Sequence, residues 1–299
     1  MNNDTLPDTE RILVVGGGTM GAGIAQAFLE NGFAVCLTEI DDTAALAARE
    51  RVLAGLERRA ARNELPAAVA ELARRLDVGA GLPARTDITF AIESVPEDED
   101  LKAGVLNRLA LAYPAAVIAT NTSALSIDAL ARRLPDAERF VGLHFFNPVP
   151  RSALVEIVRG ERTASRVTAA CHDLVRRIGK ESIEVRDSPG FATSRLGIAI
   201  GLEAIRMLEE GVASAEDIDA GMVKGYRFPI GPLALSDLVG LDVRLAIAEH
   251  LHAELGDRFR PPDLLRRLVG AGRLGVKSGH GFYEWDARGR IRRAADISV

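Results

Sequence analysis

The sequence is poor in cysteine and has no long apolar run. Cys36 and Cys171 are the only cysteines among 299 residues, which excludes a disulfide framework and favours a reduced, cytoplasmic compartment. No segment approaches the roughly 20 apolar residues that a membrane-spanning helix needs. Residues 1–10 are polar and acidic, without the apolar centre of a secretory signal. We therefore expect a cytoplasmic protein with a loose N-terminal tail and no membrane partner.

The sequence also lacks an excess of basic residues. Lysine and arginine number 37 against 42 aspartates and glutamates, a net charge of −5, which argues against nucleic acid as the main partner. A local basic patch could still bind one phosphate group. The five histidines show no spacing with cysteine or aspartate that is typical of a metal site, so no metal is expected.

Two kinds of pattern divide the chain. Short apolar segments alternate with helical patterns up to residue 187, which predicts a Rossmann-like, doubly wound parallel sheet in an α/β domain of residues 1–187. Only helical patterns follow, which predicts a smaller all-α domain of residues 188–299. The predicted strands are 11–15, 33–38, 87–93, 116–120, 139–145, 154–159 and 181–186, and the later helices are 191–210, 214–224, 233–254 and 262–271.

A glycine-rich turn, Gly16-x-Gly18-x-x-Gly21, follows the first predicted strand and opens a helix. In that context it is typical of a dinucleotide-binding loop, where glycine permits a tight turn and close approach of the pyrophosphate to the helix N-terminus. Glu39 ends the second strand, where a carboxylate binds the adenosine ribose and repels a 2′-phosphate, so NAD is predicted rather than NADP. The loop residues of this predicted site are Gly16, Gly17, Gly18, Thr19, Met20 and Gly21.

A histidine and a carboxylate lie at the ends of two neighbouring predicted strands. His144 closes one apolar strand and Glu156 lies twelve residues further on in another, so an antiparallel pair would bring imidazole and carboxylate together. His144 could then transfer a proton while Glu156 fixes its tautomer. A hydrogen-bonded structural histidine remains the alternative at this point.

Several separated motifs then occur in a characteristic order. With the glycine loop and Glu39, the segments Asn121-Thr122-Ser123, His144-Phe145-Phe146-Asn147-Pro148 and Asp187-Ser188-Pro189-Gly190-Phe191 resemble the L-3-hydroxyacyl-CoA dehydrogenase family. Residues 277–283 are similar to its C-terminal domain. The resemblance extends over residues 11–286 and is strongest to short-chain members that act on 3-hydroxybutyryl-CoA.

The resemblance implies a role for each matching residue. His144 matches the catalytic acid–base and Glu156 the carboxylate that orients it. Ser123 matches the serine that holds the 3-oxygen of the substrate, and Ser194 stands where the family has an asparagine near that oxygen. Further NAD contacts are implied for Glu97, Lys102, Asn121, Ser123, Asn147 and Lys277, with Asn147 close to both nicotinamide and histidine. An acyl-CoA substrate is implied, with Arg62 at the position of a CoA-binding lysine and Arg58 one turn before it.

Other interpretations stay open. The substrate could be a free 3-hydroxy acid or a carnitine-like compound, or the chain could be an NAD-binding protein without turnover. The arginines could form only a solvated face. The wide apolar faces of the C-terminal helices favour a homodimer interface and one wall of a substrate cleft, although core packing alone could explain them.

Overall fold

The computed structural model describes residues 10–296 and divides the chain between Ser188 and Pro189 into two compact units. The prediction placed this boundary one residue earlier. The tail predicted for residues 1–10 lies outside the described residues except for Glu10. Among the residues described, no helix is long and apolar enough to cross a membrane. Both cysteines are buried and free.

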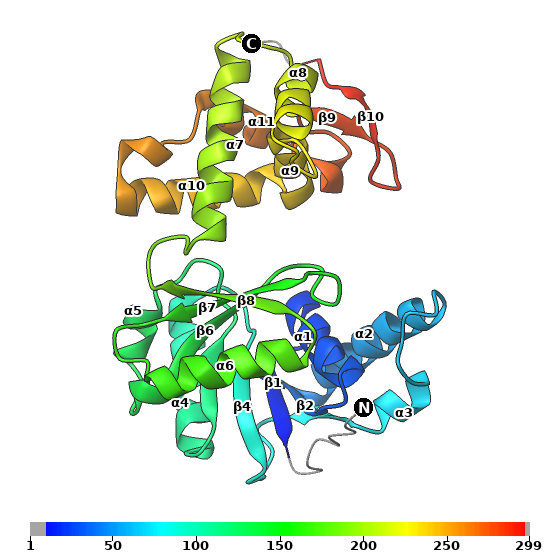
Figure 1. Ribbon diagram of the computed structural model, residues 1–299, viewed down its shortest axis with the longest axis vertical. Coiled ribbons are helices and arrows are strands. Elements are labelled where there is room, and N and C mark those ends of the chain that lie inside the picture. Colours follow the sequence, from blue (N-terminus) through cyan, green and yellow to red (C-terminus); the bar gives the residue numbers. More distant parts are fainter. Residues whose placement is uncertain (1–9, 297–299) are drawn as a thin grey trace. The chain divides into compact units, whose positions relative to one another are not determined.

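The first unit is built on one eight-stranded sheet with the strand order β3-β2-β1-β4-β5-β6-β7-β8 (Figure 1). All neighbouring strands are parallel except β6 and β7, which are antiparallel. The predicted Rossmann-like sheet is thus confirmed, and so is its antiparallel pair. Its strands are β1 Arg11–Val15, β2 Ala34–Glu39, β3 Leu76–Ala80, β4 Ile88–Glu93, β5 Val117–Thr120, β6 Phe140–Phe145, β7 Leu154–Arg159 and β8 Glu181–Arg186.

Strand β3 was missed by the sequence prediction. It lies at the edge of the sheet, and only Leu76 of its five residues is buried. An edge strand that covers little core needs no apolar run, so its sequence carries no strong strand pattern.

Helices of the first unit pack against the sheet. Side chains of α1, α2 and α6 form one hydrophobic cluster with the strands, and within it the Phe28 ring meets those of Phe33 and Phe145 edge to face. Asp41 is the N-cap of α2, and its side chain accepts a hydrogen bond from Ala44 N. The helices are α1 Thr19–Glu30, α2 Asp42–Ala60, α3 Val69–Ala73, α4 Glu99–Ala112, α5 Ile127–Ala131 and α6 Ser165–Arg177.

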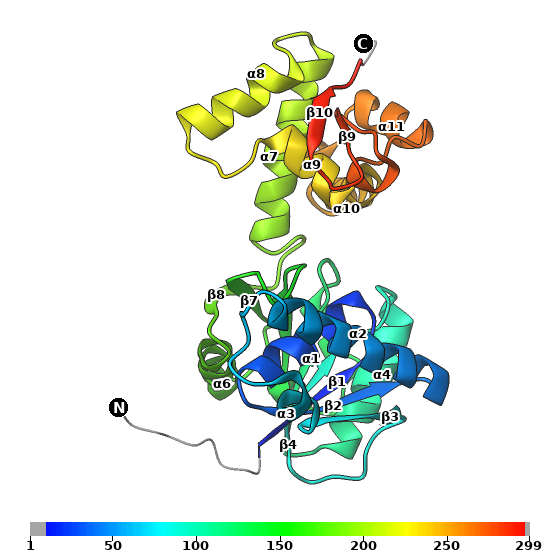
Figure 2. The same ribbon diagram turned by 90° about the vertical axis from the view of Figure 1, so that its right-hand side faces the viewer.

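The second unit is helical, as predicted, but it also contains two short strands that the sequence prediction missed (Figure 2). Strands β9 and β10 pair antiparallel. They are too short for an alternating pattern, and β9 is held by a side chain: the buried Asp237 carboxylate accepts hydrogen bonds from Phe282 N, Tyr283 N and Trp285 Nε1. The elements are α7 Thr193–Glu209, α8 Ala215–Ala220, α9 Pro232–Val239, α10 Leu241–Leu255, α11 Asp263–Gly270, β9 Tyr283–Trp285 and β10 Ile291–Ala294.

One predicted helix of this unit is in fact two. The segment 233–254 is interrupted at Gly240, whose φ of +103° lies outside the helical range. Glycine adopts such a backbone without a steric penalty. The chain therefore turns between α9 and α10, and α10 packs against α7.

Candidate active site

The glycine-rich turn joins β1 to α1 with the geometry of a nucleotide-binding loop. Gly16 has a φ of +95°, and a Cβ on Gly21 would lie 1.7 Å from Gly16 O, so helix and turn touch directly. At Gly18, by contrast, the position of a Cβ is open to 4 Å. Gly18 is the N-cap of α1 and provides no side-chain cap. The first N–H groups of α1 are therefore available to an anion such as a pyrophosphate.

Glu39 lies at the end of β2, against this turn. Its Oε1 accepts a hydrogen bond from Gly17 N at 2.6 Å, and its Oε2 accepts one from Ile40 N. The sequence reasoning missed a cation at the same place: Arg51 Nη1 of α2 donates to Gly17 O at 3.1 Å. A carboxylate and a guanidinium thus meet at one residue of the loop.

A buried charge network supports the ends of β4 and β5. Lys102 Nζ lies 2.8 Å from Glu93 Oε1, 3.1 Å from Val95 O and 3.3 Å from Glu97 Oε2. The Lys102 side chain is 1% exposed, and it joins α4 to the segment 93–97 at the end of β4. Glu93 was not predicted as a site residue, although a carboxylate at the carboxyl end of a buried strand is a recognisable signal.

Glu97 connects that network to the segment that carries Ser123. Its Oε1 accepts hydrogen bonds from Thr122 Oγ1 at 2.5 Å and from Ser123 N at 2.9 Å. Asn121 Oδ1 accepts from Phe145 N at 3.0 Å, which ties the same segment to the end of β6. Asn121 and Ser123 are thereby held close to the strand that ends in His144 and Phe145.

His144 and Glu156 are register partners across the antiparallel strands β6 and β7. His144 Nδ1 lies 2.7 Å from Glu156 Oε2, with the histidine 7% exposed and the glutamate fully buried. A carboxylate that accepts the Nδ1–H leaves Nε2 of a neutral imidazole as a proton acceptor. The Phe146 ring packs against the imidazole, with 4.4 Å between the two ring centres. This contact helps to fix the plane of the imidazole. Such an arrangement can serve chemically as an oriented general acid–base.

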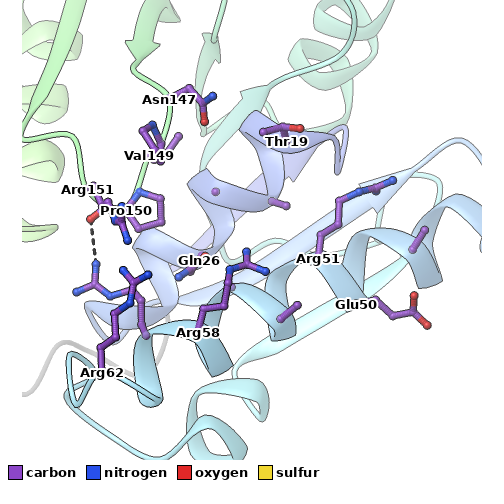
Figure 3. Close-up of a pocket in the computed structure, with 17 residues that line it drawn as sticks. Thr19, Gln26, Glu50, Arg51, Arg58, Arg62, Asn147, Val149, Pro150 and Arg151 are labelled. Carbon is purple, nitrogen blue, oxygen red and sulfur yellow. Dashed lines mark hydrogen bonds between the residues drawn. The ribbon is translucent and has the colours of Figure 1, made fainter. Parts of the chain in front are cut away.

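A pocket of about 720 Å³ lies beside α1 and α2 and is also lined by residues 147–151. Thr19 and Asn147 lie at one end of it, and the arginines of α2 project from the other side (Figure 3). Arg59 Nη1 donates a hydrogen bond to Pro150 O at 3.0 Å. Arg58 and Arg62, by contrast, are exposed. The arginines that line the pocket are Arg51, Arg58, Arg59, Arg62 and Arg151.

Comparisons with known proteins identify the family. Residues 11–188 match the family model described as "3-hydroxyacyl-CoA dehydrogenase, NAD binding domain", and residues 190–285 match "3-hydroxyacyl-CoA dehydrogenase, C-terminal domain". The chain belongs to the 3-hydroxyacyl-CoA dehydrogenase family. The resemblance read from the motifs is thus confirmed, and so is NAD as the cofactor.

Similar proteins cover nearly the whole chain. A "Probable 3-hydroxybutyryl-CoA dehydrogenase" of Bacillus subtilis is 37% identical over 94% of this chain and 99% of its own length. The "3-hydroxyadipyl-CoA dehydrogenase" of Escherichia coli is 38% identical over 94% of this chain and 60% of its own length. The crystal structure of (S)-3-hydroxybutyryl-CoA dehydrogenase PaaH1 from Ralstonia eutropha superposes with a TM-score of 0.86 at 40% identity, covering 93% of this chain and 99% of that one.

For a 3-hydroxyacyl-CoA dehydrogenase, the residues of the first unit fit NAD. The open position at Gly18 and the uncapped start of α1 suit a pyrophosphate. The Met20 side chain is partly buried against the hydrophobic core, while its backbone N–H belongs to the first turn of α1. Two further expected site residues, Ser194 and Lys277, lie in the second unit. Ser194 is partly exposed in the first turn of α7, and Lys277 pairs with Asp242 at 2.5 Å between Nζ and Oδ2.

Proposed function

We propose that this chain is an NAD-dependent L-3-hydroxyacyl-CoA dehydrogenase of short-chain substrates, such as 3-hydroxybutyryl-CoA and its oxidised form acetoacetyl-CoA. We propose further that it acts in the cytoplasm as a homodimer. The observation that carries the proposal is the hydrogen bond of 2.7 Å between His144 and Glu156, in the same unit as the nucleotide-binding loop. The names of the relatives at 37% identity and above support the choice of substrate.

In the proposed reaction, His144, Glu156 and Ser123 have separate roles. His144 Nε2 accepts the proton of the 3-hydroxyl group as the C3 hydride leaves, and Glu156 stabilises the imidazolium that results. Bound NAD supplies the hydride acceptor. Ser123 donates a hydrogen bond to the 3-oxygen, which stabilises the charge that develops there. In the reverse direction, the protonated imidazole returns its proton to the same oxygen.

The arginine-lined pocket is the part of the first unit suited to the 3′-phospho-ADP end of coenzyme A. Guanidinium groups bind phosphate through paired N–H donors. Arg58 lies on α2 and Arg62 lies two residues past the end of that helix; both are exposed and both line the pocket. A free 3-hydroxy acid would have no phosphate to place there.

The test compares acetoacetyl-CoA, acetoacetyl-pantetheine and free acetoacetate in NADH oxidation. We expect turnover of both thioesters, with a lower KM for the CoA form, and little turnover of the free acid. The double variant Arg58→Gln/Arg62→Gln should raise KM for acetoacetyl-CoA by about tenfold or more, the effect of losing one or two charge-assisted hydrogen bonds. It should leave KM for the pantetheine thioester unchanged.

Arg49→Gln is the matched control, because Arg49 is exposed on the same helix but does not line the pocket. Equal turnover of free acetoacetate and acetoacetyl-CoA would favour the free-acid interpretation. Absence of NADH oxidation with all three compounds would favour a binding protein without turnover.

A further inference from the structure

Asp187 follows the last strand of the sheet and is fixed to a helix of the first unit. Its Oδ2 accepts hydrogen bonds from Ser126 Oγ at 2.7 Å and from Asp128 N at 2.9 Å. Its own N–H donates to Arg159 O at the end of β7. Asp187 precedes Ser188, the last residue of the first unit. The carboxylate therefore ties the start of α5 to the point at which the chain leaves that unit.

Ser126 connects this carboxylate to the segment that carries Ser123. It is the N-cap of α5, so its hydroxyl holds the first turn of that helix while it donates to Asp187. Only two residues separate Ser126 from Ser123. The turn between them is closed by Thr122 Oγ1, which accepts a hydrogen bond from Leu125 N at 2.9 Å. A shift of Ser126 is therefore transmitted to Ser123 through a short, hydrogen-bonded backbone.

Glu97 anchors the other end of the same segment. Its Oε1 accepts hydrogen bonds from Thr122 Oγ1 and from Ser123 N. The Ser123 hydroxyl lies 3.4 Å from that oxygen, which is a long hydrogen bond. The direction of the hydroxyl thus depends on the backbone that carries it, and this backbone lies between two anchors, Glu97 before it and Asp187 after it.

We propose that Asp187 is a positioning residue for the reaction, which holds the segment 121–128 so that the Ser123 hydroxyl meets the 3-oxygen of the substrate. The proposal rests on the function proposed above, in which Ser123 donates to that oxygen. In this role Asp187 acts through the segment and not by contact with the substrate. Because a misplacement of about 1 Å can cost about 100-fold in rate, loss of this anchor should lower kcat.

The experiment measures the reduction of acetoacetyl-CoA by NADH in wild type, Ser123→Ala, Asp187→Ala and the double variant. Asp187→Ala should lower kcat by about tenfold. The Kd of NADH, measured by fluorescence titration, should change little, because the glycine loop and Glu39 are untouched. In the Ser123→Ala background the loss of Asp187 should have little further effect, since residues that act through one hydrogen bond give non-additive losses. A merely structural role would lower stability without this dependence of kcat on Ser123.

Two further variants test the two hydrogen bonds themselves. Both bonds reach a single oxygen of Asp187, and the amide oxygen of asparagine can accept both in its place. Asp187→Asn should therefore retain most of the kcat that Asp187→Ala loses. Ser126→Ala removes one donor from the other side, at an exposed position, and should also lower kcat. It provides the test if Asp187→Ala does not fold.

Asp136→Ala is the matched control. Asp136 is the N-cap of the helical turn Ala137–Arg139, and its side chain accepts a hydrogen bond from Glu138 N at 3.1 Å. This turn precedes β6, whereas His144 lies near the other end of that strand. Loss of the Asp136 carboxylate should thus leave kcat at the wild-type value.

Three results would overturn the role of Asp187. The first is a wild-type kcat in both Asp187→Ala and Ser126→Ala. The second is an equal loss from Asp187→Ala with and without the Ser123 hydroxyl. The third is a similar loss in Asp136→Ala, which would assign the effect to general destabilisation.

The same measurements separate this proposal from the one on which it rests. No reduction of acetoacetyl-CoA by the wild type would contradict the proposed function itself. A wild-type kcat in Ser123→Ala would contradict the role of Ser123 and, with it, that of Asp187. A loss in Ser123→Ala with none in Asp187→Ala would contradict only the role of Asp187.

Discussion

Lys102 and Glu93 form an ion pair that solvent does not reach. Nζ lies 2.8 Å from Oε1, and the two side chains are 1% and 0% exposed. Glu93 ends β4, and its other oxygen accepts a hydrogen bond from Thr120 at the end of β5. The pair thus joins α4 to the two strand ends beside the segment that carries Ser123.

Removal of the lysine charge should destabilise the first unit. Lys102→Met leaves the Glu93 carboxylate buried without its partner, which costs about 3–5 kcal/mol. Urea denaturation of wild type, Lys102→Met and Lys102→Met/Glu93→Gln measures this cost, and the double variant should recover part of it. If Lys102→Met instead kept its stability and raised only KM for NADH, the direct cofactor contact implied by the family resemblance would be the better interpretation.

His144→Gln should bind NADH normally but lose about 100-fold or more in turnover, because general acid–base catalysis typically contributes that much. Glu156→Gln should lose less, since its carboxylate orients the imidazole and stabilises its charge. Steady-state kinetics with acetoacetyl-CoA measure both losses, and NADH fluorescence titration checks binding. A correctly folded His144→Gln enzyme with nearly wild-type turnover would contradict the mechanism.

Glu39 should make the enzyme prefer NADH over NADPH, because its carboxylate would face a 2′-phosphate. Glu39→Ser should reduce that preference, and Arg51, which donates to the same loop residue, Gly17, would then lie beside the phosphate. The double variant Glu39→Ser/Arg51→Gln should therefore use NADPH less well than Glu39→Ser. Comparable kcat/KM of the wild type for both cofactors would show that Glu39 does not reach the ribose.

Ser194→Ala should lower kcat/KM for acetoacetyl-CoA by several-fold if the hydroxyl donates to the substrate oxygen, since one neutral hydrogen bond contributes about 0.5–1.5 kcal/mol. Ser194→Asn should keep or raise activity, because the amide restores the donor usual in the family. An unchanged Ser194→Ala enzyme would leave Ser123 as the serine that holds the oxygen.

The ion pair of Lys277 and Asp242 should make a small, pH-dependent contribution to stability. The hydrogen bond from Lys277 lowers the pKa of Asp242, so this stabilisation is present above the pKa of an unfolded aspartate and is lost as pH falls through the lowered value. The pair is half-exposed, so we expect about 0.2–1 kcal/mol. Thermal unfolding of wild type and Lys277→Met should differ at pH 7 and converge at the lowest pH values.

The same variant tests the cofactor contact implied for Lys277. A rise in KM for NADH at pH 7, without a change in KM for acetoacetyl-CoA, would support that contact. A change in stability alone would leave Lys277 with a structural role.

Much of the candidate site could be predicted from the sequence because its residues belong to short-range patterns. The glycine spacing requires a tight turn between strand and helix, and Glu39 follows from where the second strand ends. His144 and Glu156 were paired from their positions on two successive apolar strands, because an antiparallel connection brings such positions opposite each other. These residues all lie in segments whose backbone geometry is determined by residues nearby in the sequence.

The sequence by itself therefore determined the two-part organisation, the nucleotide loop and the pairing of His144 with Glu156. Only the tertiary structure decided that Lys102 is buried against Glu93 and that Asp237 holds a strand by three hydrogen bonds. These relationships join elements far apart in the chain. The periodicity of a helix or strand predicts which face is apolar, but not which distant side chain packs against it, because that depends on register and packing.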